Sequence, residues 1–359
     1  MNINDIDQFL SARDLPSVVA LATNEKEVIY EGAFGVGNTQ TQNQVNIDTP
    51  HAIMSMTKPI TSLAIMRLVE SGDIGLDDPA SIYVPKYRDM VVLGETDLKL
   101  KTYSTRPLTR DFTIRDLLSH TAGFGYSFCN ETLAAFGEEG ESDTFPLTHQ
   151  PGEAWSYGTN TRVLGEIICA VTGNDLYSAL SDLIFEPLGM QKTSYMPQDN
   201  QVYPHVRSGD TWAPIERFPN MPFGDRGLIS TARDYAMFLR CLLNDGAPLL
   251  RYESFQSMIN NQIGDLYITE QPAAIPNFTH PFPTGAGVDK FGLGFQLHLN
   301  PGPGMRSTGS YSWCGLLNTF FWGDPSRKVG GIVLMQLLPL YEPVCLETLS
   351  GFERRIYQD

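Results

Sequence analysis

Hydrophobic residues near both ends of the chain follow the patterns expected of β-strands. Residues 17–23 and 28–34 are rich in β-branched and aromatic side chains, and the four polar residues between them indicate a hairpin. Three more strands are expected towards the C-terminus, at residues 294–299, 316–322 and 329–337. The last two are joined at 323–326 by Gly-Asp-Pro-Ser, which favours a turn.

Helical periodicity dominates the chain between these strands. The clearest pattern is an apolar stripe through residues 55–71 that ends at Gly72. Pro59 fixes where this helix begins, because proline lacks an N–H donor and is tolerated only in the first helical turn. Ser55 is therefore expected at the helix N-terminus. Further helices are predicted from the cap Thr113 to about His120, at 160–171, at 176–185, at 232–243 after the cap Ser230, and at 344–357.

Strands at both ends with helices between them predict an α/β (α+β) fold. We expect an antiparallel sheet built from both termini and flanked by helices. The predicted organisation is a discontinuous α/β domain of residues 1–75 and 285–359, with a helical domain and loops at 76–284. A Pro- and Gly-rich segment at 264–290 is predicted to be a long functional or mobile loop. The active site is expected in the crevice between the two parts.

Composition narrows the classes of function. The chain has 359 residues and a net charge of −16, whereas nucleic-acid binding requires a basic face. Its five cysteines are odd in number and widely spaced, which argues against a disulfide framework or a zinc site. The acidic N-terminus does not resemble a signal peptide, and the longest apolar run, 332–341, is far shorter than the roughly 20 residues of a membrane span. We expect a cytoplasmic protein with no nucleic-acid or membrane partner.

The first candidate for chemistry is Ser55-Met56-Thr57-Lys58. Positions i and i+3 are neighbours on one helix face, so Lys58 is placed to activate Ser55. A lysine that is partly desolvated has a lowered pKa and can act as a base. The helix N-terminus also supplies N–H donors for a developing negative charge. The alternative is a capping serine beside a solvated lysine.

Two other segments carry candidate residues. Tyr157 precedes the helix at 160–171, and a nearby lysine ammonium would stabilise its phenolate and lower its pKa; the alternative is a packing tyrosine. Gly315, in Ser312-Trp313-Cys314-Gly315-Leu316, would allow close approach of a backbone N–H to an oxyanion; the alternative is a turn or bulge glycine. His120 and Cys314 are weaker candidates for a base and a nucleophile. The G-x-S-x-G motif of α/β-hydrolases does not occur.

Together these segments resemble the β-lactamase-related serine hydrolases, a family that includes class C β-lactamases, DD-peptidases, family VIII carboxylesterases and acyltransferases. The resemblance covers nearly the whole chain. It rests on short sequence segments that match the family in the same order along the chain. These are residues 31–35, 55–58, 72–79, 117–123, Pro151-Gly152 with Tyr157, 163–165, 187–190, 227–231 and 320–325.

The resemblance implies a role for each candidate residue. Ser55 would be acylated, Lys58 and Tyr157 would share the general-base work, and the N–H groups of Ser55 and Leu316 would form the oxyanion hole. Gly315, Trp313 and Cys314 would lie beside the substrate. The resemblance also implies a β-lactamase/transpeptidase-like fold with no metal or other cofactor.

The sequence departs from the β-lactamase pattern in two places. In the tyrosine motif Y-x-N, the third position is Thr159, and Asn160 follows one residue late. In place of K-T-G stands Trp313-Cys314-Gly315, as in family VIII esterases. Trp313 lacks the charge that would pair a penicillin carboxylate, but offers an apolar face for an acyl chain.

We therefore expect a serine hydrolase that cleaves small carboxylic esters through an acyl-enzyme on Ser55. The alternatives are an acyltransferase using the same acyl-enzyme, a β-lactamase or D-amino-acid peptidase acting on an amide, and a non-catalytic binding protein on the same fold. The presence of Ser55, Lys58 and Tyr157 together argues against the last of these.

Overall fold

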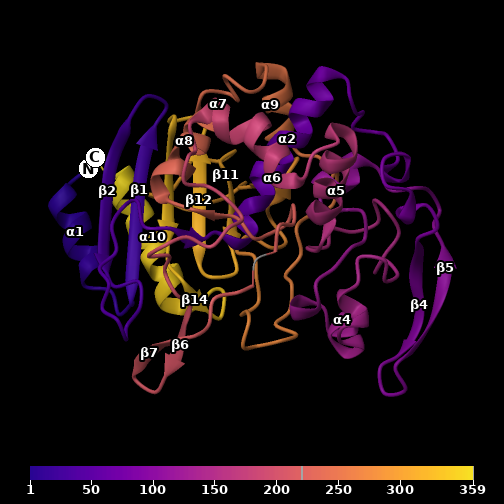
Figure 1. The fold of residues 1–359 in the computed structure, drawn as a ribbon, viewed down its shortest axis with the longest axis horizontal. Coiled ribbons are helices and arrows are strands. Elements are labelled where there is room, and N and C mark those ends of the chain that lie inside the picture. The colour runs from indigo at the N-terminus through magenta and orange to yellow at the C-terminus, as the bar shows by residue number, and fades with distance from the viewer. Residues whose placement is uncertain (220, 359) are drawn as a thin grey trace.

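A seven-stranded antiparallel sheet has the strand order β2-β1-β13-β12-β11-β10-β9. Figure 1 shows it on one side of the molecule, with a largely helical part next to it. The computed structural model describes residues 1–219 and 221–358; Asn220 and Asp359, which fall inside the predicted domain segments, lie outside the described part. The sheet strands are β1 (Ser17–Asn24), β2 (Val28–Gly35), β9 (Lys290–Phe291), β10 (Gln296–Leu297), β11 (Tyr311–Gly315), β12 (Thr319–Asp324) and β13 (Val329–Leu334).

The two ends of the chain meet within this sheet. β1 pairs with β2 on one edge and with β13 on the other, where Val19 lies opposite Leu334. Residues 17–23 of β1 are all buried, as expected of a strand covered on both faces. The predicted fold class, an antiparallel sheet with helices, is confirmed.

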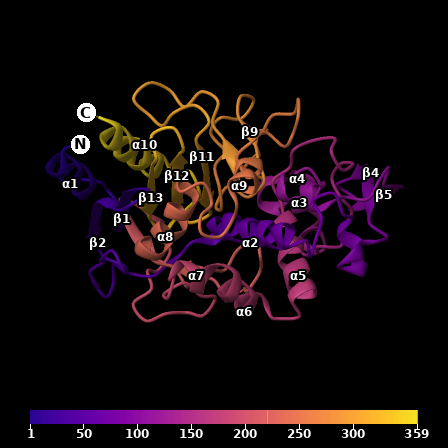
Figure 2. The same cartoon turned by 90° about the horizontal axis from the view of Figure 1, so that it is seen from above.

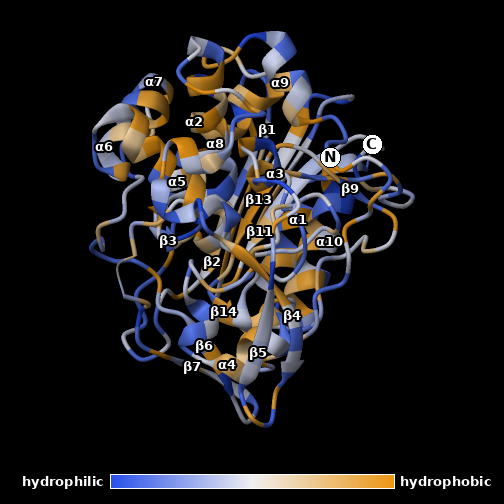
Figure 3. Ribbon diagram, turned by 90° about the vertical axis from the view of Figure 1, so that its right-hand side faces the viewer, coloured by the Kyte–Doolittle hydropathy of each residue, from blue (hydrophilic) through white to orange (hydrophobic). Residues whose placement is uncertain are grey.

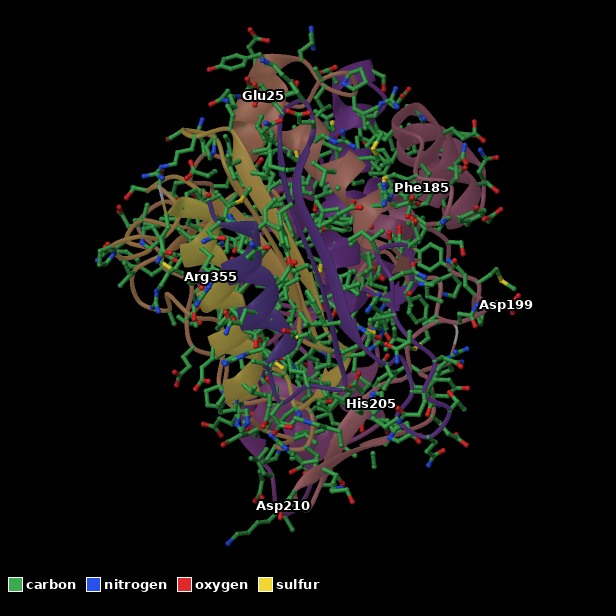
Figure 4. All side chains as sticks on the ribbon, turned by 90° about the vertical axis from the view of Figure 1, so that its left-hand side faces the viewer. Glu25, Phe185, Asp199, His205, Asp210 and Arg355 are labelled. Carbon is green, nitrogen blue, oxygen red and sulfur yellow. The ribbon has the colours of Figure 1, made fainter. Side chains whose placement is uncertain are left out.

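Helices cover both faces of the sheet. α1 (Ile3–Ser11) packs on α10 (Pro343–Tyr357) on one face, and α8 (Ala232–Leu243) packs against β1 and β13 on the other (Figure 2). Arg355, on α10, joins the two terminal helices by donating from Nε to Asp5 Oδ2 at 2.7 Å (Figure 4). Hydrophobic residues are concentrated on strands such as β11 and β13, between these layers (Figure 3).

The remaining helices lie beside the sheet and are organised around α2 (Thr57–Ser71). α2 packs against α5 (Asn160–Thr172), which in turn packs on α3 and α6. The other helices are α3 (Ile114–Leu118), α4 (Glu131–Phe136), α6 (Leu176–Leu180), α7 (Glu186–Leu188) and α9 (Tyr252–Met258). Short strands form the pairs β3 (His51–Ala52) with β8 (Ile229–Ser230), β4 (Val91–Asp97) with β5 (Thr102–Pro107), and β6 (His205–Ser208) with β7 (Thr211–Pro214) and β14 (Leu337–Leu338).

Most of the predicted helices are found close to their expected bounds. α2 ends at Gly72, which has a φ of +84°, and α3 is capped by Thr113 in a capping box. The cap predicted for α8 is wrong by one residue: Thr231, not Ser230, accepts the Asp234 N–H. Ser230 instead belongs to β8 and pairs with β3.

The prediction of a single strand at 316–322 is wrong. β11 ends at Gly315, residues 316–318 form a turn, and β12 begins at Thr319. Asn318 turns the chain with a φ of +56°, and its side-chain amide donates to the carbonyls of Leu337 at 2.9 Å and Pro339 at 2.8 Å. The turn that follows spans 325–328, two residues later than predicted.

Several elements were not predicted, namely α1, α4, α9 and the hairpins β4–β5 and β6–β7. The tip of the β6–β7 hairpin, at Asp210, projects from the body of the molecule (Figure 4). The domain boundaries at 75 and 285 stay a prediction. Within residues 1–219 and 221–358, none of the helices combines the length and apolar character needed to cross a bilayer.

Candidate active site

Ser55 lies in a short 3₁₀ turn, η1 (Met54–Met56), that leads directly into α2, and its side chain is half-buried. Met54 has a φ of +47°, a left-handed conformation that costs a residue with a Cβ about 1–2 kcal/mol. Ile53 N–H anchors the turn by donating to Leu228 O at 3.0 Å. On the other side, a Cβ added to Gly315 would lie 2.3 Å from Ile53 O, so only glycine allows β11 to end against this turn.

Lys58 is 1% exposed and reaches three acceptors. Its Nζ donates to Ser55 Oγ at 3.1 Å, to Tyr126 Oη at 2.9 Å and to the backbone oxygen of Asp225 at 2.9 Å. The i, i+3 spacing in the sequence correctly predicted the first of these contacts. The other two come from loops far from Lys58 in the chain.

These contacts fix where the free electron pair of a neutral Lys58 points. The Asp225 carbonyl can only accept a hydrogen bond. Tyr126 donates its own proton to the Asp225 carboxylate, so its oxygen must accept from Lys58. A neutral amine has two N–H groups, and both are used by these partners. Its lone pair therefore faces the Ser55 hydroxyl, which is the geometry of a base aimed at a nucleophile.

Burial lowers the pKa of Lys58 to about 7, because desolvation disfavours the ammonium. The Asp225 charge opposes this change, and the charges of Arg226 and Arg162 add to it. The predicted lowering of the lysine pKa is thus confirmed. At neutral pH a substantial share of Lys58 can accept a proton.

Asp225 is fully buried and organises the groups around Lys58. Burial alone would raise the pKa of its carboxyl, but the charges of Lys58, Arg162 and Arg226 keep it below the usual range. Arg162 Nε lies 3.5 Å from Asp225 Oδ1. The carboxylate therefore stays ionised and keeps Tyr126 oriented as a donor.

Tyr157 is 3% exposed and lies next to the same lysine. Its ring centroid is 4.8 Å from Lys58 Nζ and 5.2 Å from the Tyr126 ring. The expected lowering of its pKa is wrong: burial raises the pKa of the Tyr157 phenol well above 10, and hydrogen bonding to Ser55 offsets this only in part. Lys58 faces the ring and hydrogen-bonds Tyr126, so Tyr157 keeps its proton.

With this geometry established, comparison with known proteins identifies the family. The Beta-lactamase family model matches residues 3–350. The chain belongs to the beta-lactamase family. Among relatives within it is a lovastatin esterase from Penicillium rubens, 26% identical over 95% of this chain and 94% of the relative. Another is a monacolin J acid methylbutanoyltransferase from Aspergillus terreus, 25% identical over 97% of this chain and 93% of the relative.

A solved structure of simvastatin synthase from Aspergillus terreus, a mutant form, superimposes with a TM-score of 0.84 at 25% identity. The alignment covers 98% of this chain and 92% of that one. The relatives that this chain resembles thus include an esterase and an acyltransferase. This protein is an enzyme of the serine-hydrolase kind.

The segment that replaces the K-T-G motif of the beta-lactamase family is packed inside the protein. Trp313 is 3% exposed, and its ring lies 5.1 Å from that of Tyr157 and 5.4 Å from that of Phe291. Its ring packs on that of Tyr157, and the contact of Trp313 with an acyl chain stays a prediction. Cys314 is also buried, which raises its thiol pKa to about 12, so it is not an activated nucleophile.

Leu316 follows Gly315 in the turn between β11 and β12. Its half-buried side chain packs on a cluster of Met54, Leu317 and Leu338. This packing keeps the backbone at Leu316 next to the turn that carries Ser55. Its N–H as an oxyanion donor stays a prediction.

His120 and Asn160 form a separate buried pair. Asn160 Nδ2 lies 2.9 Å from His120 Nδ1, and both residues are at most 2% exposed. Burial, together with the Lys58 charge, lowers the pKa of His120 well below 6.5, so its ring is neutral. Asn160 is thus engaged with His120 and does not substitute for the asparagine of the Y-x-N motif.

Tyr126, Asp225 and Arg162 are the site residues that sequence reasoning missed. A signal was present for two of them: Tyr126 follows the glycine-rich Gly123-Phe124-Gly125, and Asp225 stands between Gly224 and Arg226-Gly227. Binding and catalytic residues are found on loops more often than on helices or strands. Their convergence on Lys58, however, depends on contacts across 68 and 167 residues of sequence.

Proposed function

We propose that this enzyme hydrolyses carboxylic esters through an acyl-enzyme formed on Ser55. The observation that carries this proposal is the placement of Lys58, with its Nζ 3.1 Å from Ser55 Oγ and its two other contacts supplied by Tyr126 and the Asp225 carbonyl. A pKa of about 7 makes the amine an effective base at neutral pH. The esterases among the relatives support the same reading.

In the first half-reaction, neutral Lys58 takes the Ser55 proton and Oγ attacks the ester carbonyl carbon. The N–H groups of Ser55 and Leu316 stabilise the oxyanion. The carbon–oxygen bond to the alcohol then breaks, and Tyr157 donates its proton to the leaving oxygen. The protonated Lys58, 4.8 Å from the Tyr157 ring centre, balances the charge of the resulting phenolate.

In the second half-reaction, the Tyr157 phenolate takes a proton from water and the hydroxide attacks the acyl carbon. The bond to Ser55 Oγ breaks, and Lys58 returns the proton to that oxygen. The carboxylic acid leaves and every group regains its starting proton. An alcohol in place of water would give acyl transfer, which is the second candidate function and is supported by the methylbutanoyltransferase relatives.

Esters fit this site better than penicillins do. A penicillin brings a carboxylate next to Ser55, and the position of the K-T-G lysine is taken here by the uncharged Trp313. A hydrogen bond to a charged group contributes about 1.5–3 kcal/mol, so its loss weakens binding by roughly tenfold to a hundredfold.

The five free cysteines also fit the proposed cytoplasmic location.

The proposal is tested by mapping the acyl group after incubation with p-nitrophenyl butyrate. The wild-type protein is expected to carry the acyl group on the peptide that contains Ser55, and Ser55→Ala to reduce turnover at least about a thousandfold. Ser71→Ala is the matched control, because Ser71 is an exposed serine at the far end of the same helix. Near wild-type turnover in Ser55→Ala would overturn the proposal. Added alcohol separates the two functions, since acyl transfer gives a new ester.

A further inference from the structure

A second group of residues with the geometry of a nucleophile and its base is centred on Ser312 of β11, outside the site of Ser55. Ser312 Oγ lies 2.6 Å from His298 Nε2, and His298 Nδ1 lies 2.9 Å from Asp289 Oδ2. The three residues thus form a Ser–His–Asp relay, in which the carboxylate orients the imidazole and the imidazole faces the hydroxyl. We propose that Ser312 is a second nucleophile, activated by His298 and Asp289, that reacts with small carboxylic esters.

Strand pairing brings the relay together. β10 pairs with β11 so that Gln296 lies opposite Ser312, and His298 N–H donates to Ser310 O at 2.8 Å. These contacts place His298 beside Ser312, one strand away. The position of His298 is therefore fixed by the sheet and not by a mobile loop.

Asp289 is held by its own set of donors. Its Oδ1 accepts the Leu299 N–H at 3.0 Å, and its Oδ2 accepts from Gln296 Nε2 at 2.8 Å. Gly285 makes room for the carboxylate: its φ is +88°, and a Cβ there would lie 2.1 Å from Asp289 Oδ2. Burial raises the pKa of Asp289, but the contact with His298 and these donors outweigh it and lower the pKa overall. The carboxylate is ionised and accepts the His298 Nδ1 proton.

Arg306 determines which nitrogen of His298 is free to act as the base. Arg306 Nε donates to Glu353 Oε1 at 2.8 Å, and the same carboxylate binds Nη2. The remaining Nη1 points at His298 Nε2 from 3.4 Å. A guanidinium can only donate, so Nε2 presents its lone pair, the tautomer needed to accept the Ser312 proton.

The relay opens into a cavity that can hold a ligand. A cavity of about 410 Å³ between α10 and the segment 284–306 is lined by both Asp289 and His298, and a smaller one of about 50 Å³ beside it is lined by His298 and Ser312. The larger cavity has the size of pockets that hold small organic ligands, and Ser312 lines the smaller one next to it. Leu346 and Leu349 line both cavities and supply an apolar wall for an acyl chain. Ser312 is half-buried and so reachable from this side.

The reaction balances without any further component. His298 Nε2 takes the Ser312 proton, Oγ bonds to the ester carbonyl carbon, and the alcohol leaves with the proton from His298. Water then gives a proton to His298 and attacks the acyl carbon. The carboxylic acid departs as Ser312 Oγ recovers the proton. The products are those of ordinary ester hydrolysis, formed at a site separate from Ser55.

The test uses a fluorophosphonate–biotin probe on the full-length Ser55→Ala variant. Ser312 Oγ would attack phosphorus and expel fluoride, with its proton passing through His298 to solvent. Fragmentation of the tryptic peptide 307–327 then locates the label. We expect label on Ser312 and, with p-nitrophenyl acetate, a slow residual hydrolysis that disappears in Ser55→Ala/Ser312→Ala. The label on peptide 307–327 is measured in a variant that lacks Ser55, and residue 55 lies on another tryptic peptide. The labelling result therefore does not depend on the function proposed for Ser55.

Two variants and one control test the relay. His298→Gln, in the Ser55→Ala background, is expected to slow labelling at least about a hundredfold. In Asp289→Asn, the side-chain amide would donate a hydrogen bond to His298 Nδ1. The imidazole proton would then lie on Nε2, which could no longer accept the Ser312 proton, so labelling is expected to slow to a similar extent. Ser350→Ala is the matched control, since Ser350 lines the same cavity but donates to the backbone of Glu347. Unlabelled Ser312, or labelling that neither relay variant slows while melting temperatures are unchanged, would overturn the proposal.

Discussion

Acidification is expected to inactivate the enzyme with a midpoint near pH 7. Lys58 has a pKa of about 7, and only its neutral form can take the proton of Ser55. Below this pH the amine is protonated and its lone pair is lost. His120 does not titrate in the same range, because burial and the Lys58 charge lower its pKa well below 6.5. The midpoint is a property of Lys58 together with the tyrosines that contact it.

The size of the effect follows from the neutral fraction of Lys58. With a pKa of about 7, roughly nine-tenths of the amine is neutral at pH 8 and about 1% at pH 5. The value of kcat/KM is therefore expected to fall about ninetyfold between these two pH values. A lysine with the ordinary pKa of 10.5 would be mostly protonated throughout and would give a much lower rate at pH 8.

The assay is hydrolysis of p-nitrophenyl butyrate at low substrate concentration, with kcat/KM measured at half-unit steps from pH 5 to 9. Folding must be followed in parallel by circular dichroism. Because folding lowers the pKa of Lys58, the unfolded chain binds this proton more tightly. The contribution of this group to the free energy of unfolding therefore decreases as the pH falls from about 10.5 to 7, and is constant below that.

Two results would refute this reasoning. One is a rate that stays flat between pH 5 and 8 in a folded protein, which would mean that no group with a pKa near 7 controls the attack by Ser55. The other is a variant Lys58→Arg with wild-type activity, because arginine keeps its proton at every pH in this range.

Further predictions concern the groups around Lys58 and the substrate. Tyr126→Phe should lower kcat by about tenfold to a hundredfold through loss of the 2.9 Å contact to Lys58, whereas Tyr195→Phe, a buried tyrosine that donates to a backbone carbonyl, should leave kcat unchanged in the same assay. Lys58→Ala and Tyr157→Phe should each lower kcat by orders of magnitude. The double variant should have a kcat little lower than that of either single variant, because the two residues act together. A loss of kcat equal to the product of the two single losses would show that they act independently. Gly315→Ala should lower both the melting temperature and kcat/KM, since its Cβ would lie 2.3 Å from a backbone oxygen, and an unchanged protein would contradict the packing described. Clear turnover of p-nitrophenyl esters is expected beside weak or absent turnover of benzylpenicillin, and equal kcat/KM for the two would show that a carboxylate is accommodated after all.

Local signals made the nucleophile and its helix predictable from the sequence. The position of Pro59 restricts where the helix can start, and the three-residue spacing sets Lys58 beside Ser55 without any long-range contact. The hairpin β1–β2 and the terminal helix were likewise found from short-range patterns. These features depend on neighbours in sequence, which a single chain displays directly.

Other features depend on contacts between distant parts of the chain and could not be read in this way. The break between β11 and β12 is stabilised when Asn318 bonds carbonyls about twenty residues away, and these contacts are not visible in the local sequence. The pKa of Tyr157 was misjudged because a nearby lysine was given more weight than burial, and burial depends on the whole fold. The role of Asp225 was invisible for the same reason.

The order of the sheet has a consequence for how this enzyme is made. Ser55 and Lys58 are synthesised early, but the edge of β1 pairs with β13, and the turn that carries Ser55 rests against the end of β11. A nascent chain that stops before residue 311 lacks both supports. The reactive serine thus leaves the ribosome long before the strands that complete its surroundings. Catalytic competence is therefore expected only after β11 and β13 have been synthesised.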